Sequence, residues 1–338
     1  METRIETPSA EDALRRLPKA EVHVHLEGCF EAGDLASLAT AAGEPLPRPL
    51  ESLFTFVDLD SFLELLDWAC GLVRTPEQAA RAAYRFCERE TASGVRYADV
   101  IVNPTHWGAW IGRLPALVDA LCAGFDEAEE DGLCPAGLCL SLLRTQSAAE
   151  ADELVDTMIG LRQPRLVALS VDGNETAAGR SSPRFADAFV RAGEAGFGRT
   201  VHSGESGGPD GMWDAIELLG ADRFDHGVRA VEDDELVKVL ADRRIPLGMC
   251  PGSNLALGLY HRRGEHPIER LRTAGVPVSI NTDDPGFLRT RLELEYARTA
   301  EVFAWDGGVV KEIVRTSIEA SFADPDRKRA LLAELEAA

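Results

Sequence analysis

The chain has 338 residues, 45% of them hydrophobic and 27% charged, which is the composition of a globular protein with ample core. Its formal net charge is −22 at pH 7 and its sequence pI is about 4.7, so we expect neither nucleic acid nor an anionic membrane as a partner. The seven cysteines form no Cys-x-x-Cys pair, residues 1–10 lack a secretory pattern, and no apolar run approaches the roughly 20 residues of a membrane helix. These features predict a cytoplasmic protein with reduced thiols.

Short apolar runs alternate with helical patterns along the chain. After a short amphipathic helix at 10–17, strands are predicted at 21–26, 94–102, 138–143, 166–171, 199–202, 223–226, 246–249 and 277–281. Helices are predicted at 75–93, 114–131, 148–160, 184–195, 211–219, 233–242, 267–274, 289–303, 308–322 and 325–335. Eight such units predict an α/β fold, a closed (β/α)8 TIM barrel with extra N- and C-terminal helices, in one domain spanning 1–338. An open doubly wound sheet is the alternative, but no glycine-rich dinucleotide loop follows the first strand.

One further helical pattern has two interpretations. Leu59, Phe62, Leu63 and Leu66 fall on one face of a helix that follows the proline-rich loop at 44–49. This face either packs on the core or forms a hydrophobic lid over a flat aromatic substrate. In the second case Phe62 is a substrate contact.

Polar residues at the strand ends point to a metal site, because the carboxyl ends of barrel strands form the site in such folds. His23 and His25 are two apart on the first strand, so they point the same way and can hold one cation. His202 ends the fifth strand and Asp283 follows the eighth. Three neutral imidazoles and one carboxylate suit Zn²⁺, although Fe²⁺ or Mn²⁺ can be accepted. Water on such a metal ionises near neutral pH and becomes a nucleophile.

Three more residues lie beside these candidate ligands. His226 ends the sixth strand and is either a further ligand or, as we prefer, a partner that orients or deprotonates the water. Glu205 lies three residues past His202, with a glycine between them that lets both side chains face the cavity, where an acid can shuttle protons. Its alternative role is an acid favoured by the dipole of a following helix. Asp284 is free, once a metal holds Asp283, to hydrogen-bond a ring nitrogen of the substrate.

These motifs, taken as a set, resemble those of the adenosine deaminase family within the amidohydrolase superfamily of metal-dependent barrels. They occur in the family's order and extend over almost the whole chain. The matching stretches are Leu-Pro-Lys-Ala-Glu-Val-His-Val-His-Leu-Glu-Gly at 17–28, His202-Ser203-Gly204-Glu205, Asp225-His226-Gly227, Cys250-Pro251-Gly252-Ser253-Asn254 and 279–285.

The resemblance implies a role for each candidate residue. One Zn²⁺ would be held by four ligands: His23, His25, His202 and Asp283. Glu205 would be the acid and base, and His226 would orient the nucleophile. Asp284 would meet purine N7, and the backbone amide of Gly173 would meet purine N3. The implied reaction is hydrolytic deamination of a 6-aminopurine, in which Glu205 protonates ring N1, metal-activated water adds to C6, and ammonia leaves.

Position 27 bears on the choice of substrate. Family members that act on nucleosides resemble His-x-His-Leu-Asp-Gly, with the Asp on the ribose 5′-hydroxyl, whereas adenine deaminases resemble His-x-His-Leu-Glu-Gly. Glu27 therefore either fills the space of a ribose or still reaches a hydroxyl. Gly173 stands where adenine deaminases tend to show serine, which favours a nucleoside. The sequence predicts adenosine or a related adenine nucleoside, with free adenine or a modified adenine nucleoside as alternatives.

Some other residues have two possible roles, and two other functions compete with deamination. The exit of the second strand departs from the family's more usual Arg-x-Ser-Pro pattern, so His106, Trp107 and Trp110 either line an unusual pocket or simply pack the loop. His261 and His266 are expected to be exposed. A metal hydrolase that cleaves an amide or ester, and a catalytically inactive metal-stabilised binding protein, are the competing functions. The sequence predicts no oligomeric state.

Overall fold

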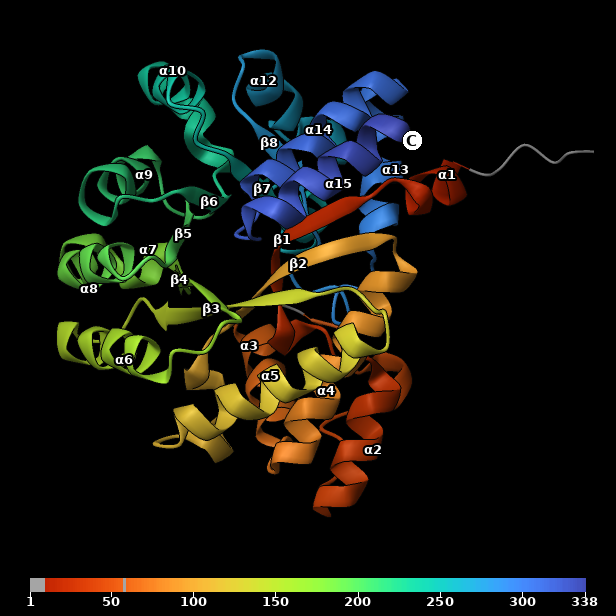
Figure 1. Cartoon of the computed structure of the whole chain (residues 1–338), viewed down its shortest axis with the longest axis vertical. Helices are drawn as coiled ribbons and strands as arrows, with labels where there is room; N and C mark the ends of the chain where they lie inside the picture. The colour runs from red at the N-terminus through yellow and green to blue at the C-terminus, as the bar shows by residue number, and fades with distance from the viewer. Residues whose placement is uncertain (1–9, 57–58) are drawn as a thin grey trace, which may run out of the picture.

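The computed structural model describes residues 10–56 and 59–338, and its eight parallel strands follow one another around a barrel in chain order (Figure 1). The strands are β1 (Lys19–His25), β2 (Val95–Val102), β3 (Ala136–Leu143), β4 (Leu166–Asp172), β5 (Gly198–Ser203), β6 (Arg223–His226), β7 (Leu247–Met249) and β8 (Val278–Ile280). The backbone N–H of His25 donates to the carbonyl of Asp283 (2.7 Å), and that of Asp283 donates to His23 (3.2 Å). These bonds bring the segment after β8 back to β1, so the predicted TIM barrel is confirmed.

Helices cover the outside of the barrel and extend it at both ends. They are α1 (Ala10–Arg16), α2 (Ala32–Ala42), α3 (Leu59–Gly71), α4 (Pro76–Ala92), α5 (Leu114–Glu130), α6 (Ala148–Leu161), α7 (Glu175–Ala178), α8 (Ser182–Glu194), α9 (Pro209–Asp214), α10 (Asp234–Asp242), α11 (Pro251–Ala256), α12 (Ile268–Thr273), α13 (Leu292–Phe303), α14 (Gly307–Ala320) and α15 (Pro325–Ala337). The predicted extra helices are confirmed: α1 packs against α13, beside α14 and α15 (Figure 1). Of the helices in the described ranges, none combines the length and the apolarity that crossing a bilayer requires.

The differences from the predicted elements have local causes. α7 and α11 are four and six residues long, too short for a helical periodicity to show. α2 buries only Leu35 and Ala39, so its apolar face is narrow. The helix predicted at 211–219 begins at Pro209 and changes to a π-turn at Ala215–Leu219 before Gly220 ends it in the left-handed conformation.

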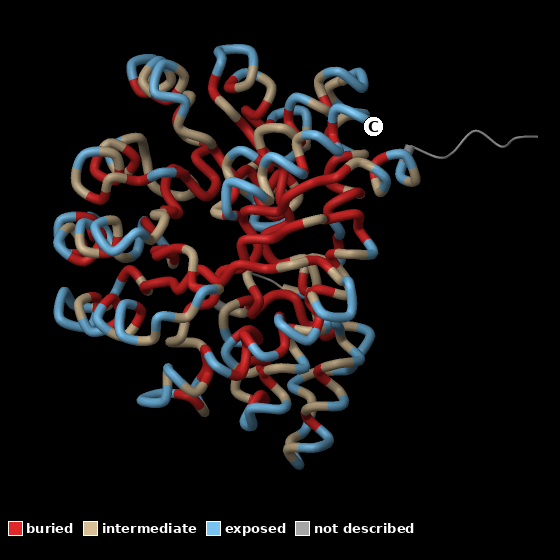
Figure 2. Tube along the Cα trace, viewed as in Figure 1, coloured by how far each residue is buried: buried red, intermediate tan, exposed pale blue. Residues whose placement is uncertain are grey.

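The strands are buried along almost their whole length because helices or the barrel interior cover both faces. Figure 2 shows the buried trace running along the strands, with exposed positions on the outer helices. All seven cysteines are free and buried, as small apolar side chains are expected to be.

A column of charged and polar side chains fills the barrel below the strand ends. Arg223 Nη1 donates to Asp99 Oδ2 (2.7 Å), and its Nε lies 3.6 Å from Asp225 Oδ1. Thr200 Oγ1 donates to the other oxygen of Asp225 (2.7 Å). All four residues are buried, and a buried charge is tolerated only when it is paired in this way. The column supports Asp225 directly beneath the ring of His202.

Candidate metal centre and active site

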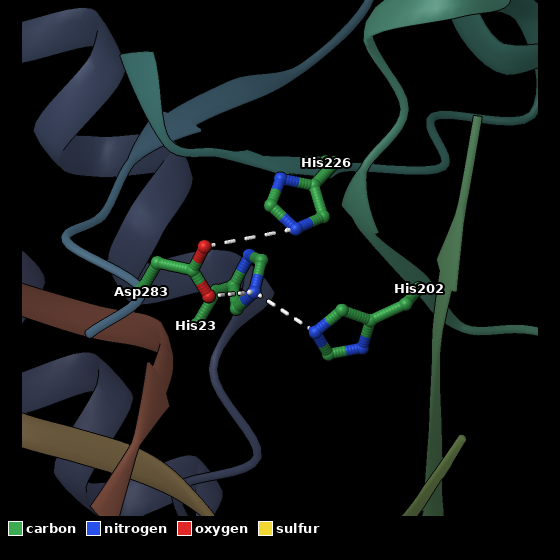
Figure 3. Close-up of side chains that lie close together, drawn as sticks. All are labelled: His23, His202, His226 and Asp283. Atoms are coloured by element: carbon green, nitrogen blue, oxygen red, sulfur yellow. Dashed lines mark hydrogen bonds and ion pairs between the residues drawn. The ribbon is translucent and has the colours of Figure 1, made fainter. Parts of the chain in front are cut away.

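Four candidate ligand atoms converge where β1, β5 and β8 end (Figure 3 shows three of the residues). Nε2 of His202 lies 3.1 Å from Nε2 of His23 and 2.9 Å from Nε2 of His25. Oδ1 of Asp283 lies 3.2 Å from Nε2 of His23 and 3.5 Å from Nε2 of His25. Ligand atoms about 2.0–2.2 Å from a tetrahedral ion are themselves roughly 3.3–3.6 Å apart. The spacing and the donor set therefore fit one divalent metal ion.

The contacts behind these ligands leave their metal-facing atoms free. His23 Nδ1 lies 2.9 Å from the carbonyl of Gly248, which places the ring proton on Nδ1 and the lone pair on Nε2. Asp225 Oδ2 lies 3.4 Å from His202 Nδ1 without a hydrogen bond between them, so a carboxylate faces the ring nitrogen that is directed away from the other candidate ligands. Ser253 Oγ donates to Asp283 Oδ2 (2.6 Å), which leaves Oδ1 toward the imidazoles.

Shifted pKa values and strained backbone conformations occur at the same residues. Burial opposes the charge of Asp283, but His23 and the other imidazoles hold the pKa of this carboxyl well below its usual range. Burial and the neighbouring imidazoles lower the pKa of His202, so its ring stays neutral and can ligate. Asp283 (φ 69°) and His226 (φ 71°) have left-handed backbones, a conformation that costs energy in residues other than glycine and concentrates at functional sites.

A chain of hydrogen bonds defines the protonation of His226. The backbone N–H of Ile268 donates to His266 Nδ1 (3.3 Å), so the ring proton of His266 is on Nε2. That nitrogen donates to Asn254 Oδ1 (3.0 Å), which turns the amide Nδ2 toward His226 Nδ1 (3.3 Å). His226 Nδ1 therefore accepts, and its Nε2 carries a proton.

His226 faces both the candidate ligands and Glu205. Its Nε2 lies 3.3 Å from Glu205 Oε1 and 3.9 Å from Asp283 Oδ2. One ligand atom each from His23, His202, His226 and Asp283 lies within 4.8 Å of the others (Figure 3). Distance alone would admit His226 as a ligand, but a nitrogen that carries a proton has no lone pair for a metal.

The expectation that His266 is exposed is wrong. The residue is 2% exposed, because its ring packs beside Tyr260 and reaches Asn254. Burial, with a contribution from Arg263, lowers the pKa of His266 to about 3. The residues around His266 in the sequence are polar, and nothing in that pattern indicates that His266 is buried against Asn254. His261 is exposed, as predicted.

Glu205 is held in the loop after β5, beside His226. Only 21% of its side chain is exposed. Burial, reinforced by the charge of Asp283, raises the pKa of Glu205 to about 8, so the group is an acid at neutral pH. Gly204 has the predicted turn, with φ of 70°. Because α9 begins four residues later, at Pro209, Glu205 is not a first-turn helix acid.

Asp284 lies against the first motif of the chain. A Cβ at Gly28 would stand 2.0 Å from Asp284 Oδ1, so only glycine fits at that position. Burial and the charges of Asp283 and Glu27 raise the pKa of Asp284 well above its usual range. Among the described residues, Asp284 Oδ1 is buried without a hydrogen-bond partner. A protonated carboxyl in this state can donate to a ligand.

Glu27 organises the exit of β2. Its Oε1 accepts from the backbone N–H of Asn103 (2.7 Å) and from the indole N–H of Trp107 (2.7 Å). Its Oε2 is buried and finds no hydrogen-bond partner in the described part of the chain. Trp110 instead donates to the carbonyl of Val73 (2.7 Å), and His106 Nδ1 pairs with Asp67 (2.7 Å). Trp107 therefore belongs with Glu27, whereas Trp110 packs the loop.

Phe62 and Gly173 approach the same region from other elements. Phe62, on α3, packs its ring 5.7 Å from that of Phe287, three residues after Asp284, so α3 covers the loop that carries Asp284. Gly173 has φ of 97°, and its carbonyl accepts from Arg144 Nε (3.1 Å). Arg144 also donates through Nη2 to the carbonyl of His202. No local pattern singled out Arg144, whose partners are 29 and 58 residues away.

Comparison with known proteins agrees with this geometry. Residues 18–338 match the family model described as "Adenosine deaminase". The chain is 36% identical over 321 residues to an adenine deaminase from Rhizobium leguminosarum bv. trifolii, covering 94% of this chain and 99% of that protein. Two solved structures superpose with a TM-score of 0.89. The first, adenine deaminase from Arthrobacter aurescens, is 29% identical (95% of this chain, 98% of that chain), and the second, an amidohydrolase from Burkholderia ambifaria with bound Zn, is 28% identical (99% and 94%).

Proposed function

This chain belongs to the adenosine deaminase family of metal-dependent aminohydrolases, and we propose that it deaminates free adenine to the 6-oxopurine and ammonia. The family acts on small purines, and the choice among them is our proposal. Free adenine, which the sequence left as an alternative to adenosine, is favoured by the name of the similar Rhizobium protein and of the similar Arthrobacter structure.

Glu27 is the observation that carries this proposal. Its Oε1 is already occupied by two N–H donors, so Oε2 is the acceptor that remains for a ligand. Free adenine has an N–H at N9, whereas adenosine has a ribose there and no donor on that atom. A buried acceptor without a partner costs about 1–3 kcal/mol, so the site should bind the purine that supplies the missing donor. The indole N–H that occupies Oε1 belongs to Trp107, whose ring packs 6.4 Å from that of Phe30.

The metal proposed is Zn²⁺, held by His23, His25, His202 and Asp283. The mixed set of nitrogen and oxygen donors at tetrahedral spacing supports this choice, and the Burkholderia structure contains zinc. When bound, the ion lowers the pKa of a water ligand toward 7. His226 is left outside the ligand set, because its Nε2 carries a proton and has no lone pair for the ion.

The chain's own groups then handle the protons of the reaction. Glu205 enters protonated and donates to ring N1, which makes C6 electrophilic. His226 Nε2–H orients the attacking water from the Glu205 side. Asp284, protonated in its buried position, donates to N7, and the backbone amide of Gly173 meets N3. As the water oxygen bonds to C6, Glu205, now a carboxylate, would take a proton from the water and pass it to the 6-amino group. The C6–N bond then breaks to release ammonia, and the proton left on the C6 oxygen returns to Glu205.

One observation supports adenosine as the second candidate. Gly173 stands where the family's adenine deaminases tend to show serine. The test is to load the purified protein with Zn²⁺ and follow ultraviolet absorbance with adenine, adenosine, 5′-modified adenosines and N6-substituted purines. We expect kcat/KM for adenine to exceed that for adenosine by at least roughly 100-fold. A preference for adenosine would replace the proposal, and no turnover of any aminopurine would leave an inactive binding protein or another hydrolase.

A further inference from the structure

A single buried carboxylate holds the whole loop that carries Glu205. Glu175 opens α7, two residues after Gly173, and is buried. Its two oxygens accept five hydrogen bonds from five consecutive residues. The donors are Ser203 Oγ (3.1 Å) and the backbone N–H groups of Gly204 (3.0 Å), Glu205 (2.9 Å), Ser206 (3.1 Å) and Gly207 (2.9 Å).

This arrangement satisfies backbone groups that have no other partner in the loop. Residues 204–207 follow β5 without forming a helix or strand, so their N–H groups enter no ladder. Four successive N–H groups directed at one point form an anion-binding nest, and here the anion is a side chain of the chain itself. The carbonyls of the loop have partners of their own: that of Ser203 accepts from Gly227 N (3.0 Å), and that of Ser206 accepts from Arg229 Nη1 (2.8 Å) and Thr176 Oγ1 (3.3 Å).

Gly207 allows the loop to pass close to the carboxylate of Glu175. A Cβ at Gly207 would stand 2.9 Å from Glu175 Oε1, so a side chain there would push the carboxylate away. The negative charge also has a buried cation nearby, since Arg144 Nη2 lies 4.0 Å from Oε1. The buried carboxylate therefore has favourable partners on two sides, the loop N–H groups and Arg144.

We propose that Glu175 is the positioning residue for Glu205. By holding residues 203–207, it keeps Glu205 Oε1 at 3.3 Å from His226 Nε2, where Glu205 can exchange protons with substrate. Glu175 contacts none of the candidate metal ligands' metal-facing atoms, so it acts through the loop rather than through the metal. The inference rests on the proposed deaminase function, and it adds a residue that works without touching the substrate.

The decisive variant is Glu175→Gln, which keeps the size of the side chain. A Gln oxygen can replace only one carboxylate oxygen, and the amide NH₂ then faces loop N–H groups that need an acceptor. Since a displacement of about 1 Å in a reacting group costs about 100-fold in rate, we expect kcat for adenine to fall about 100-fold with KM and metal content nearly unchanged. Hydrogen exchange of the 204–207 amides, measured by mass spectrometry without substrate, should accelerate at least roughly tenfold, because they lose hydrogen-bond protection.

Two further variants complete the experiment. Glu175→Asp keeps the charge and both oxygens, so kcat and amide protection should lie between those of the wild type and Glu175→Gln. Thr176→Val is the matched control: it removes the Thr176 Oγ1 contact to the Ser206 carbonyl (3.3 Å) from the same short helix and should leave kcat and exchange unchanged.

Wild-type kcat in Glu175→Gln, or an equal loss in Thr176→Val, overturns the proposal. So does unprotected exchange of 204–207 in the wild type, a measurement that stands even if Glu175→Gln fails to fold. If the wild type turns over no aminopurine, the proposed function fails, while the exchange data still decide whether Glu175 holds the loop.

Discussion

Replacing Glu27 by Gln isolates the contact that we assign to purine N9. The amide oxygen can still accept from Asn103 N and Trp107 Nε1, each now 2.7 Å from Oε1. The NH₂ group then replaces the unpartnered Oε2, so a donor faces the N9–H donor of adenine. Burial raises the pKa of Glu27, and His25, His106 and the indole N–H only partly offset that rise, so Oε2 accepts from N9–H when the carboxyl is ionised.

The magnitude follows from the loss of one hydrogen bond to a charged group. Such a bond contributes about 1.5–3 kcal/mol, and each 1.4 kcal/mol or so is a factor of ten. The kcat/KM for adenine should therefore fall roughly 10- to 150-fold, with metal content and melting temperature close to the wild type. Glu51→Gln, which neutralises an exposed glutamate, is the matched control and should keep wild-type kcat/KM.

The assay compares adenine with 9-methyladenine, which has no N–H at position 9. The wild type should discriminate against 9-methyladenine by at least the same factor, and Glu27→Gln should show little further discrimination between the two purines. Equal losses on both substrates, or unchanged discrimination in the variant, would refute a contact between Glu27 and N9–H.

Three further predictions concern the site and its supports. Glu205→Gln should lower kcat about 10²- to 10⁴-fold and leave metal content unchanged; retained turnover contradicts the acid role. Asp225→Asn, which weakens the support of His202, should reduce zinc affinity about 10- to 100-fold in a chelator competition, and unchanged affinity would remove Asp225 from that role. His266 takes up its proton near pH 6.5 when unfolded but at about 3 when folded, so its contribution to stability is present at pH 7 and lost as pH falls below 6.5. His266→Asn should therefore flatten the fall in unfolding free energy between about pH 6 and pH 4, by up to about 1.4 kcal/mol per pH unit, as measured by denaturant titration.

Hydrogen bonds between distant loops explain why some residues around the site gave no signal in the sequence. Asn254 and His266 lie on either side of a polar loop, and their importance depends on a backbone N–H at Ile268 and on the ring of His226. Glu175 looks like an ordinary acid at the start of a short helix. Its five partners lie about 30 residues further along the chain, after another strand, and meet it only when β4 and β5 lie side by side.

The sequence by itself determined the barrel and identified the candidate metal ligands. Strand periodicity placed eight βα units, and the two-residue spacing of His23 and His25 put both side chains on one face, because successive residues of a strand alternate. Both patterns depend only on residues that are close together in the sequence, so they are visible without the tertiary structure. Only the tertiary structure decided the rest: which nitrogen of His226 carries the proton, which oxygen of Glu27 stays free, and which carboxylate holds the Glu205 loop. Each depends on hydrogen bonds between residues distant in the chain, whose direction no local pattern encodes.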